Sequence, residues 1–395
     1  MKSYPTIRWR ERAAALASDL AERGILRSDV WRAAVEQTPR HLFVPASAIS
    51  NEAGSVAEYS DVDTWLNNVY SDSTLVVQRR QARDGGLAQL PTSSSTMPSL
   101  MIEMLEALDV RDGHRVLEIG TGTGYNSALL AHRLGGDNVV SIDIDPDLVE
   151  AAKRRLGELG HFPTLIAGDG LAGVPDHGPY DRIIATCAVP ETPLAWIEQL
   201  APGGSMLVNL RGYVIGVLCL LMKQDNSEVI GPIIRSGSDF MWLRQQLDDP
   251  LREQRPPPHI GAKKVARTLT ALSPANVLDS SDFLLMLQLE LPGLRMVCST
   301  DVFDPMERRN RRGILMYAED GSHAQVIDEP EADDQYRVIQ GGSRRLWDTV
   351  ETAYDLWAQL ANPAPHRFGV VANKTIQFVW LDNDMNWLRW PLPLV

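Results

Sequence analysis

The chain has 395 residues, of which 44% are hydrophobic and 23% are charged, and its formal net charge is −13. This length and composition predict a globular protein with two domains, or one domain with large additions. The acidic charge argues against a nucleic-acid-binding protein and is compatible with an enzyme that acts on small molecules or peptides. Three cysteines, none in a C-x-x-C pair, predict reduced thiols and indicate neither a disulfide framework nor a metal site.

The N-terminus and the apolar runs predict a soluble, cytoplasmic protein. Residues 1–12 are polar and lack the apolar region of a signal peptide. The longest apolar run, 214–222, is far shorter than the ~20 residues of a membrane helix, so we expect a buried strand there. The sequence leaves the oligomeric state open and is compatible with a monomer, and it indicates no membrane partner.

The part before residue 98 is expected to be a helical segment with a substrate loop. Residues 1–45 carry two helical patterns, of which one ends at Gly24 and the other begins after Ser28 and ends at Pro39. The stretch 46–95 is rich in serine, aspartate and glycine, and we expect it to be irregular apart from a short strand over 73–77.

Strands and helices alternate after residue 98, which predicts a doubly wound, Rossmann-like α/β core over 98–250. Helices are expected to begin at Pro98, at Tyr125 and after the capping residue Asp145. The expected parallel strands cover residues 115–119, 139–142, 164–166, 181–185 and 205–210.

An accessory α+β region is expected over 251–395. It begins with a proline-rich segment, 252–259, which predicts an extended linker. A helix-like stretch (264–272), several strands, a helix over about 346–357 and a final strand (375–381) follow. A basic cluster, expected to be a solvated loop, consists of Arg308, Arg309, Arg311 and Arg312.

The segment Glu118-Ile119-Gly120-Thr121-Gly122-Thr123-Gly124, between a strand and a helix, carries the strongest functional signal. Its glycines let a ligand approach the backbone, and the helix behind it offers free N–H groups. Tyr125 stands where a dinucleotide fingerprint has its third glycine, which disfavours a pyrophosphate cradle. Glu118 would also repel a pyrophosphate, but it could attract the cationic amino-acid end of S-adenosylmethionine through water.

Acidic residues at the ends of the next two strands support the same cofactor. Asp143 could accept hydrogen bonds from both ribose hydroxyls, and Asp169 could receive the adenine amino group. Each acid taken alone could instead cap a helix or shape a turn, as could Asp145. The expected cofactor residues are Glu118, Gly120, Thr121, Gly122, Gly124, Asp143, Ile144, Asp169, Gly170 and Leu171.

These residues resemble the protein-L-isoaspartate O-methyltransferase family over roughly residues 10–225. The resemblance is carried by the segments 38–45 (TPRHLFVP), 70–72, 116–125, 167–170, and 181–184 continuing into 202–204. It implies a class I methyltransferase fold that transfers a methyl group from S-adenosylmethionine to the side-chain carboxylate of isoaspartate in peptides. The family's catalytic hydroxyl, in an [ST]-x-P segment, falls at Thr96. Because the register could slip, Ser94 and Ser95 remain candidates.

Two departures from the family's repair enzymes suggest a more specialised substrate. The chain has an insertion over 76–91, and it continues through 251–395 where we expect the repair enzymes to end. This arrangement resembles methyltransferases that accompany ribosomally made, modified peptides: graspetides, lanthipeptides and lasso peptides. The closing pattern (344–348, 367–369 and 379–382) looks most like the graspetide-associated group.

That resemblance implies methylation of an ordinary aspartate in a modified precursor peptide, which the C-terminal region would help to bind. The ester would collapse to a succinimide (aspartimide), which gives isoaspartate on hydrolysis. Three alternatives stay open: a repair enzyme for isoaspartate in damaged proteins, a small-molecule methyltransferase, and an inactive module that binds a peptide.

Overall fold

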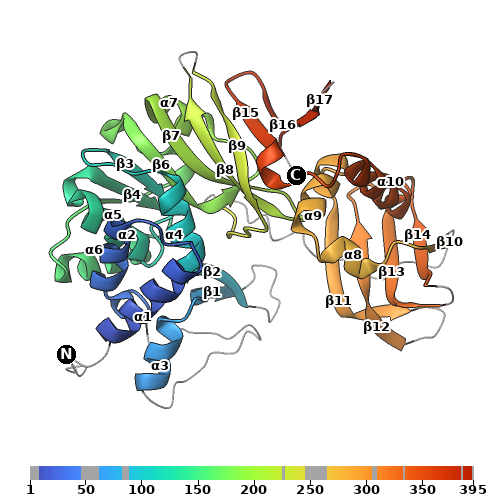
Figure 1. The fold of residues 1–395 in the computed structure, drawn as a ribbon, viewed down its shortest axis with the longest axis horizontal. Helices are drawn as coiled ribbons and strands as arrows, with labels where there is room; N and C mark the ends of the chain where they lie inside the picture. The colour runs from blue at the N-terminus through green and yellow to red at the C-terminus, as the bar shows by residue number, and fades with distance from the viewer. Residues whose placement is uncertain are drawn as a thin grey trace.

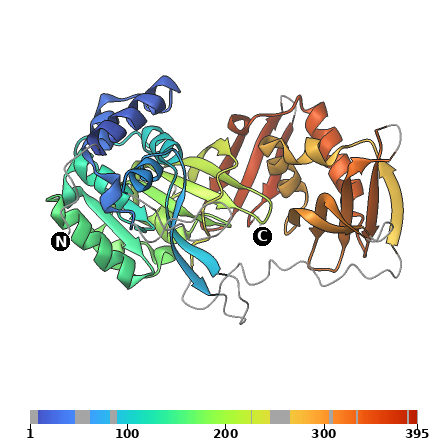
Figure 2. The same ribbon diagram turned by 90° about the horizontal axis from the view of Figure 1, so that it is seen from below.

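A ten-stranded sheet forms the centre of the computed structural model, which describes residues 9–45, 62–81, 89–224, 227–244, 265–304, 309–331, 334–383 and 386–393 (Figure 1). The N-terminal helices lie at one end of the molecule and a five-stranded sheet lies at the other, in both views (Figures 1 and 2). The expected linker at 252–259, Arg308 and residues 46–61 fall outside the described residues.

The two helices expected before residue 45 are confirmed. Helix α1 (Trp9–Glu22) buries its apolar stripe, and α2 (Asp29–Gln37) buries Trp31, Ala34 and Val35. Both pack in one hydrophobic cluster with α4 (Pro98–Ala107), which begins at its proline as expected. These three helices therefore pack together, and α4 begins directly after the segment that carries the candidate hydroxyls.

The expectation of irregular structure is wrong for the described part of 46–95. Residues 62–69 form helix α3 (Val62–Val69), and strands β1 (Leu75–Gln81) and β2 (Gln89–Ser95) pair as an antiparallel hairpin. Strand β2, with the sequence QLPTSSS, contains few residues that favour strands, so pairing with β1 rather than propensity orders it. The described parts of the inserted segment, residues 76–81 and 89–91, are therefore ordered as strands.

The expected α/β core is confirmed in one half of the large sheet. Five neighbouring strands run parallel in the order β5-β4-β3-β6-β7. Their bounds are β3 (Val116–Ile119), β4 (Val139–Asp143), β5 (Thr164–Ala167), β6 (Tyr180–Val189) and β7 (Leu200–Arg211). The helices that follow are α5 (Tyr125–Leu134), α6 (Pro146–Glu158) and α7 (Leu194–Gln199).

The other half of this sheet is antiparallel, an addition to the expected parallel core. A short connection after β7 returns the chain as β8 (Gly216–Lys223), the buried strand expected at 214–222, and then as β9 (Val229–Ser236). Such a short connection can join only antiparallel strands. The chain end then adds β15 (Phe368–Ala372), β16 (Gln377–Asn383) and β17 (Asn386–Pro391), with β15 paired to β9. The sheet thus crosses the expected domain boundary at residue 250.

A five-stranded antiparallel sheet occupies the region between β9 and β15, in the order β10-β14-β13-β12-β11. The strands are β10 (Val265–Thr270), β11 (Arg295–Asp304), β12 (Arg309–Tyr317), β13 (His323–Pro330) and β14 (Tyr336–Gly341). Helices α8 (Pro274–Leu278), α9 (Ser281–Glu290) and the expected α10 (Leu346–Gln359) accompany it. One continuous cluster of buried side chains connects the two sheets.

Two expectations in this region are wrong. The stretch 264–272 contains strand β10 and not a helix, because pairing with β14 along its whole length outweighs its weak helical pattern. The described arginines of the basic cluster, Arg309, Arg311 and Arg312, lie in strand β12 and not in a loop. There Arg311 and Arg312 form ion pairs with Glu329 and Asp328 of the neighbouring strand β13. The positive charges of these two arginines are therefore balanced within the protein. Within the described ranges, no helix has the length and apolar character needed to cross a bilayer.

Candidate active site

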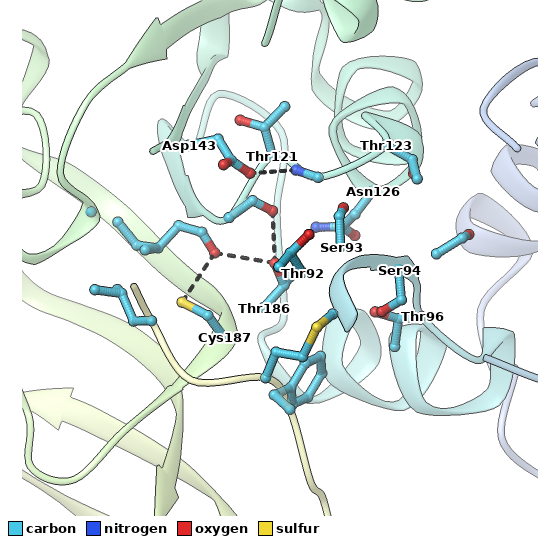
Figure 3. A pocket seen from close by; sticks show the side chains of 18 of the residues that line it. Thr92, Ser93, Ser94, Thr96, Thr121, Thr123, Asn126, Asp143, Thr186 and Cys187 are labelled. Carbon is cyan, nitrogen blue, oxygen red and sulfur yellow. Dashed lines mark hydrogen bonds between the residues drawn. The ribbon is translucent and has the colours of Figure 1, made fainter. Parts of the chain in front are cut away.

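A cavity of about 340 Å³ opens at the carboxyl ends of β3, β4 and β6, where open α/β sheets bind their ligands. Its lining comes from the glycine loop, from the β1–β2 hairpin with residue 96, and from residues 239–244. Figure 3 shows Asp143 and Thr121 on one side of this cavity, and Ser94 and Thr96 on the other. The expected cofactor loop and the expected hydroxyls therefore face one shared space.

The glycine loop has a backbone that only glycine adopts easily. Gly120 has φ +95°, and a Cβ atom there would lie 2.7 Å from Thr186 Oγ1. Gly122 has φ +52°, and its added Cβ would lie 3.6 Å from Ser93 Oγ of the hairpin. The loop therefore keeps the floor of the cavity open and lies close to the hairpin. Gly124 does not line the cavity, because its Cα faces Ala152 of α6.

Glu118 is fully buried beneath the loop and is surrounded by hydrogen-bond donors. Asn126 Nδ2 donates to Glu118 Oε1 at 2.7 Å, while the hydroxyls of Ser141 and Ser127 donate to Oε2. Burial raises the pKa of Glu118 to about 7, although these three bonds favour the charged form. Glu118 thus braces the loop against α5 and β4, and its contact with the amino end of the cofactor stays a prediction.

Asp143 lies at the end of β4, lines the cavity and holds two backbone N–H groups. Gly122 N donates to Asp143 Oδ2 at 2.8 Å, and Asp145 N donates to Oδ1 at 3.0 Å. Burial raises the pKa of Asp143, whereas these bonds and the positive charge of Arg244 act in the opposite direction. Each carboxylate oxygen has further lone pairs, so Asp143 can still accept ribose hydroxyls.

The remaining expected cofactor residues divide into two groups. Thr121, Ile144 and Gly170 line the cavity. Asp169 and Leu171 are not among the lining residues, and the Asp169 side chain accepts Leu171 N at 2.9 Å to begin the short turn Gly170–Ala172. The turn-shaping role considered for Asp169 is therefore present, and its adenine contact stays a prediction.

The three candidate hydroxyls all line the cavity but differ in their surroundings. Ser95 is 2% exposed, and its Oγ accepts a 3.4 Å hydrogen bond from Arg40 Nη2. Neither Ser94 nor Thr96 has a side-chain hydrogen bond to another residue of the described ranges, and Figure 3 places the two side by side. The geometry therefore favours Thr96 and Ser94 over Ser95 for contact with a substrate.

Arg40 holds the segment with the candidate hydroxyls in place, and the sequence did not predict this role. The side chain is fully buried, and its guanidinium donates to the carbonyl oxygens of Val69, Ser71, Ser73 and Thr96. Burial lowers the pKa of Arg40 to about 10, which leaves it charged at neutral pH. The available signal was the place of Arg40 in the segment 38–45, one of the segments that carry the family resemblance.

Asp72 fixes the other side of the same segment. It accepts Ser99 N, at the start of α4, at 2.8 Å, while Met97 N donates to Thr74 Oγ1 at 3.3 Å. Burial acts to raise the pKa of Asp72, but its bonds to Ser99 and Arg23 outweigh burial and lower it. Thr96 thus lies between Ser95 and Met97, which are both anchored by hydrogen bonds. A group that orients a substrate needs such a fixed position.

Residues 239–244, which we call the strap, form the third wall and were also missed. Trp242 forms a parallel bridge with Ala188 at the end of β6, and Ala188 exchanges backbone hydrogen bonds with Met241 and Leu243. A Cβ atom on Gly170 would lie 3.2 Å from Leu243 Cδ1, so the strap packs closely on the turn after β5. No local pattern identified it, because a single bridge and not a regular element places it.

Among the described residues, the cavity lining offers no strong nucleophile. Burial raises the pKa of Cys187 well above its usual range, so its thiol is neutral at physiological pH. Thr186 Oγ1 donates to the carbonyl oxygen of Gly120 at 2.7 Å and is used structurally. The site combines a cofactor cradle, a carboxylate and free hydroxyls, which suits transfer of a preactivated group and does not suit covalent catalysis by the protein.

Comparisons with known proteins agree with this chemistry. The family model described as protein-L-isoaspartate(D-aspartate) O-methyltransferase matches residues 11–236. The protein-L-isoaspartate O-methyltransferase of Methanopyrus kandleri is 32% identical over 217 residues, which cover 54% of this chain and 83% of the relative. The protein of the same description from Pyrococcus horikoshii is 33% identical over 211 residues, covering 53% and 82%.

A solved structure extends the likeness in fold beyond this region. It is titled protein-L-isoaspartate O-methyltransferase, is 24% identical, and has a TM-score of 0.53 over 95% of this chain and 100% of its own. The expectation that proteins of this name end shortly after the core is therefore wrong for that protein. From the family match, the chain belongs to the protein-L-isoaspartate(D-aspartate) O-methyltransferase family and is an S-adenosylmethionine-dependent carboxyl methyltransferase.

Proposed function

We propose that the chain methylates the side-chain carboxylate of an isoaspartyl or aspartyl residue in a peptide, with Thr96 as the hydroxyl that orients the carboxylate. The observation that carries this proposal is the single cavity in which Thr96 and Ser94 face Asp143 and the glycine loop. A cofactor held by the loop and a carboxylate held by Thr96 would meet across a short space.

The residues present fit the cofactor. The open backbone at Gly120 and Gly122 leaves room for it, and Asp143 supplies acceptors for its ribose. S-adenosylmethionine supplies an activated methyl group on a sulfonium, so the carboxylate needs no strong base to attack it. The Thr96 hydroxyl donates a hydrogen bond to one carboxylate oxygen and directs the other toward the methyl group. The strap and the hairpin form two walls of this space.

Two substrate classes share this chemistry. Isoaspartate in damaged proteins is supported by the family match and by the descriptions of the curated relatives. An aspartate in a ribosomally made, graspetide-like precursor is supported by the closing sequence pattern and by the hairpin at the cavity. The C-terminal region would then help to bind the precursor. This region does not separate the two classes, because the solved protein with the isoaspartate title matches it as well.

Mass spectrometry of three peptides separates these alternatives. The enzyme and S-adenosylmethionine are incubated with an isoaspartyl peptide, with the matched aspartyl peptide, and with a cyclised precursor encoded beside the gene. Methylation of the isoaspartyl peptide alone supports repair. A transient methyl ester on the precursor, followed by loss of methanol, supports aspartimide formation. Absence of methylation on all three peptides contradicts the proposed function.

A further inference from the structure

Two side chains of the β1–β2 hairpin bind Asp145, which lies two residues after Asp143 of the cavity wall. Arg80 Nη2 donates to Asp145 Oδ2 at 2.6 Å, and Gln78 Nε2 donates to the same oxygen at 2.9 Å. The Asp145 side chain is 1% exposed, whereas that of Arg80 is 56% exposed. The inserted hairpin therefore reaches inward to a buried carboxylate.

The two oxygens of Asp145 have separate tasks. Oδ1 accepts Asp147 N at 3.0 Å and caps helix α6, while Oδ2 is left for the hairpin. If the hairpin moved away, Oδ2 would lose both side-chain donors at a buried position, which is unfavourable. Helix capping alone accounts for Oδ1 and does not account for the bonds to Gln78 and Arg80.

Hydrogen bonds continue from this contact in both directions. Toward the cofactor side, Asp145 N donates to Asp143 Oδ1 at 3.0 Å, and Asp143 in turn holds Gly122 N. Toward the other wall, Thr92 Oγ1 donates to Gln78 Oε1 at 2.6 Å. Thr92 lines the cavity together with Ser93 and Ser94, on the strand β2 that leads to Thr96. An unbroken polar path thus runs from the glycine loop to the wall with the candidate hydroxyls.

We propose that Gln78 and Arg80 are positioning residues that couple cofactor binding to the substrate wall. A cofactor that binds Asp143 restrains the turn from Asp143 to Asp145, and this turn holds the hairpin. The hairpin wall is then fully ordered once the cofactor is bound, and it receives the acidic peptide side chain in that state. This inference rests on the proposed function, because it takes Asp143 as the cofactor side of the cavity.

Hydrogen–deuterium exchange of the full-length enzyme, with and without S-adenosylhomocysteine, tests the coupling without any substrate. We expect the ligand to slow exchange in residues 75–81 and 89–95 at least about fivefold, the lower end of ordinary coupling between sites. Exchange in helix α10, which contributes no residue to the cavity lining, serves as the internal reference. Binding of S-adenosylhomocysteine without any slowing in the hairpin overturns the inference and leaves the proposed function intact.

The double variant Gln78→Ala/Arg80→Ala removes both donors. We expect it to bind S-adenosylhomocysteine, to lose the slowing of exchange in the hairpin, and to raise KM for the peptide at least about fivefold with a smaller change in kcat. Arg80→Lys, which keeps a charged donor, should restore part of the effect. The matched control is Arg111→Gln, which removes an exposed ion pair with Asp109 away from the cavity and should behave as the parent protein.

The outcomes separate the two claims. If the double variant keeps the ligand-dependent slowing seen in the parent protein, Gln78 and Arg80 do not couple the sites and the inference fails. A purely structural role would lower the melting temperature but leave that slowing unchanged, which also counts against the inference. If the parent protein does not bind S-adenosylhomocysteine at all, the proposed function fails and the inference fails with it.

Discussion

Thr96 and Asp143 lie on opposite walls of one cavity, so changes at these two residues should have different consequences. Asp143→Ala should weaken the binding of S-adenosylhomocysteine about a hundredfold or more, because each hydrogen bond to a charged group contributes about 1.5–3 kcal/mol. The same change also frees the N–H groups of Gly122 and Asp145. Calorimetry measures this loss, and an unchanged affinity would contradict the cofactor assignment.

Thr96→Ala should keep the cofactor affinity and lose about a hundredfold in kcat, the effect expected when a reacting group is misplaced. Thr96→Ser keeps the hydroxyl and should retain most of the activity. Steady-state kinetics with a methylated peptide, together with calorimetry, checks both variants. Full activity of Thr96→Ala would transfer the orienting role to Ser94, which also lines the cavity and lacks a side-chain bond to a described residue.

Glu118 gives the stability of the protein a characteristic dependence on pH. Burial raises the pKa of its carboxyl group from an ordinary value of 4.5 to about 7 in the folded protein. Between these values the folded state keeps a proton that the unfolded state has released, so stability falls as pH rises. Glu118→Gln has no such proton. The difference in melting temperature between the parent protein and this variant should therefore decline from pH 4.5 to 7, and parallel curves would contradict this account.

The sequence could locate those parts of the cavity wall that a local sequence pattern marks. The glycine loop, Asp143 and the hydroxyl segment could be found because strand, loop and helix signals surround them in the sequence. Arg40 and the strap were missed because their partners lie far along the chain, such as Ser73 and Thr96 for Arg40. No local pattern encodes such long-range contacts.

At the scale of elements, Arg40 joins three segments and should be sensitive to small changes. Arg40→Lys keeps the charge but loses most of the bonds to backbone carbonyl oxygens, which then stay buried without donors. We expect a loss in free energy of unfolding on the order of 3 kcal/mol, measured by denaturant titration. Arg111→Gln, at an exposed ion pair, should leave the midpoint unchanged. Equal midpoints for both variants would contradict the anchoring role.

Elements with strong periodicity were predicted correctly, whereas elements that depend on a partner were not. Helices α1, α5 and α10 carry clear apolar stripes, and their positions agree with the sequence. Strands β2 and β10 were predicted as a loop and a helix. Their extended conformation depends on pairing with β1 and β14, and the local sequence does not show this pairing. Pairing partners distant in sequence are not visible in a local pattern.

At the scale of the whole molecule, the last strands complete the sheet that carries the site. Strand β15 pairs with β9, and Phe368, Val370 and Ala372 belong to the same buried cluster as the core strands. The sequence divided the chain at residue 250 because the proline-rich segment 252–259 follows, but such a segment does not show where a later strand returns.

A chain that ends at residue 250 should therefore not fold as a stable methyltransferase core. It would expose the edge of β9 and the apolar faces that now pack on α9 and β15, which favours aggregation. Size-exclusion chromatography and thermal unfolding of this truncated chain check the expectation against the full chain. A soluble truncated form that unfolds cooperatively and binds S-adenosylhomocysteine would show that the C-terminal strands are dispensable.

The proposed carboxylate methylation is tested most directly by methyl transfer from S-adenosylmethionine to matched isoaspartyl and aspartyl peptides, with the modified atom located by tandem mass spectrometry. We predict a methyl ester on a side-chain carboxylate of at least one peptide. This product should be lost in Thr96→Ala and Asp143→Ala. Methylation at a nitrogen atom, or transfer that persists in both variants, would contradict it.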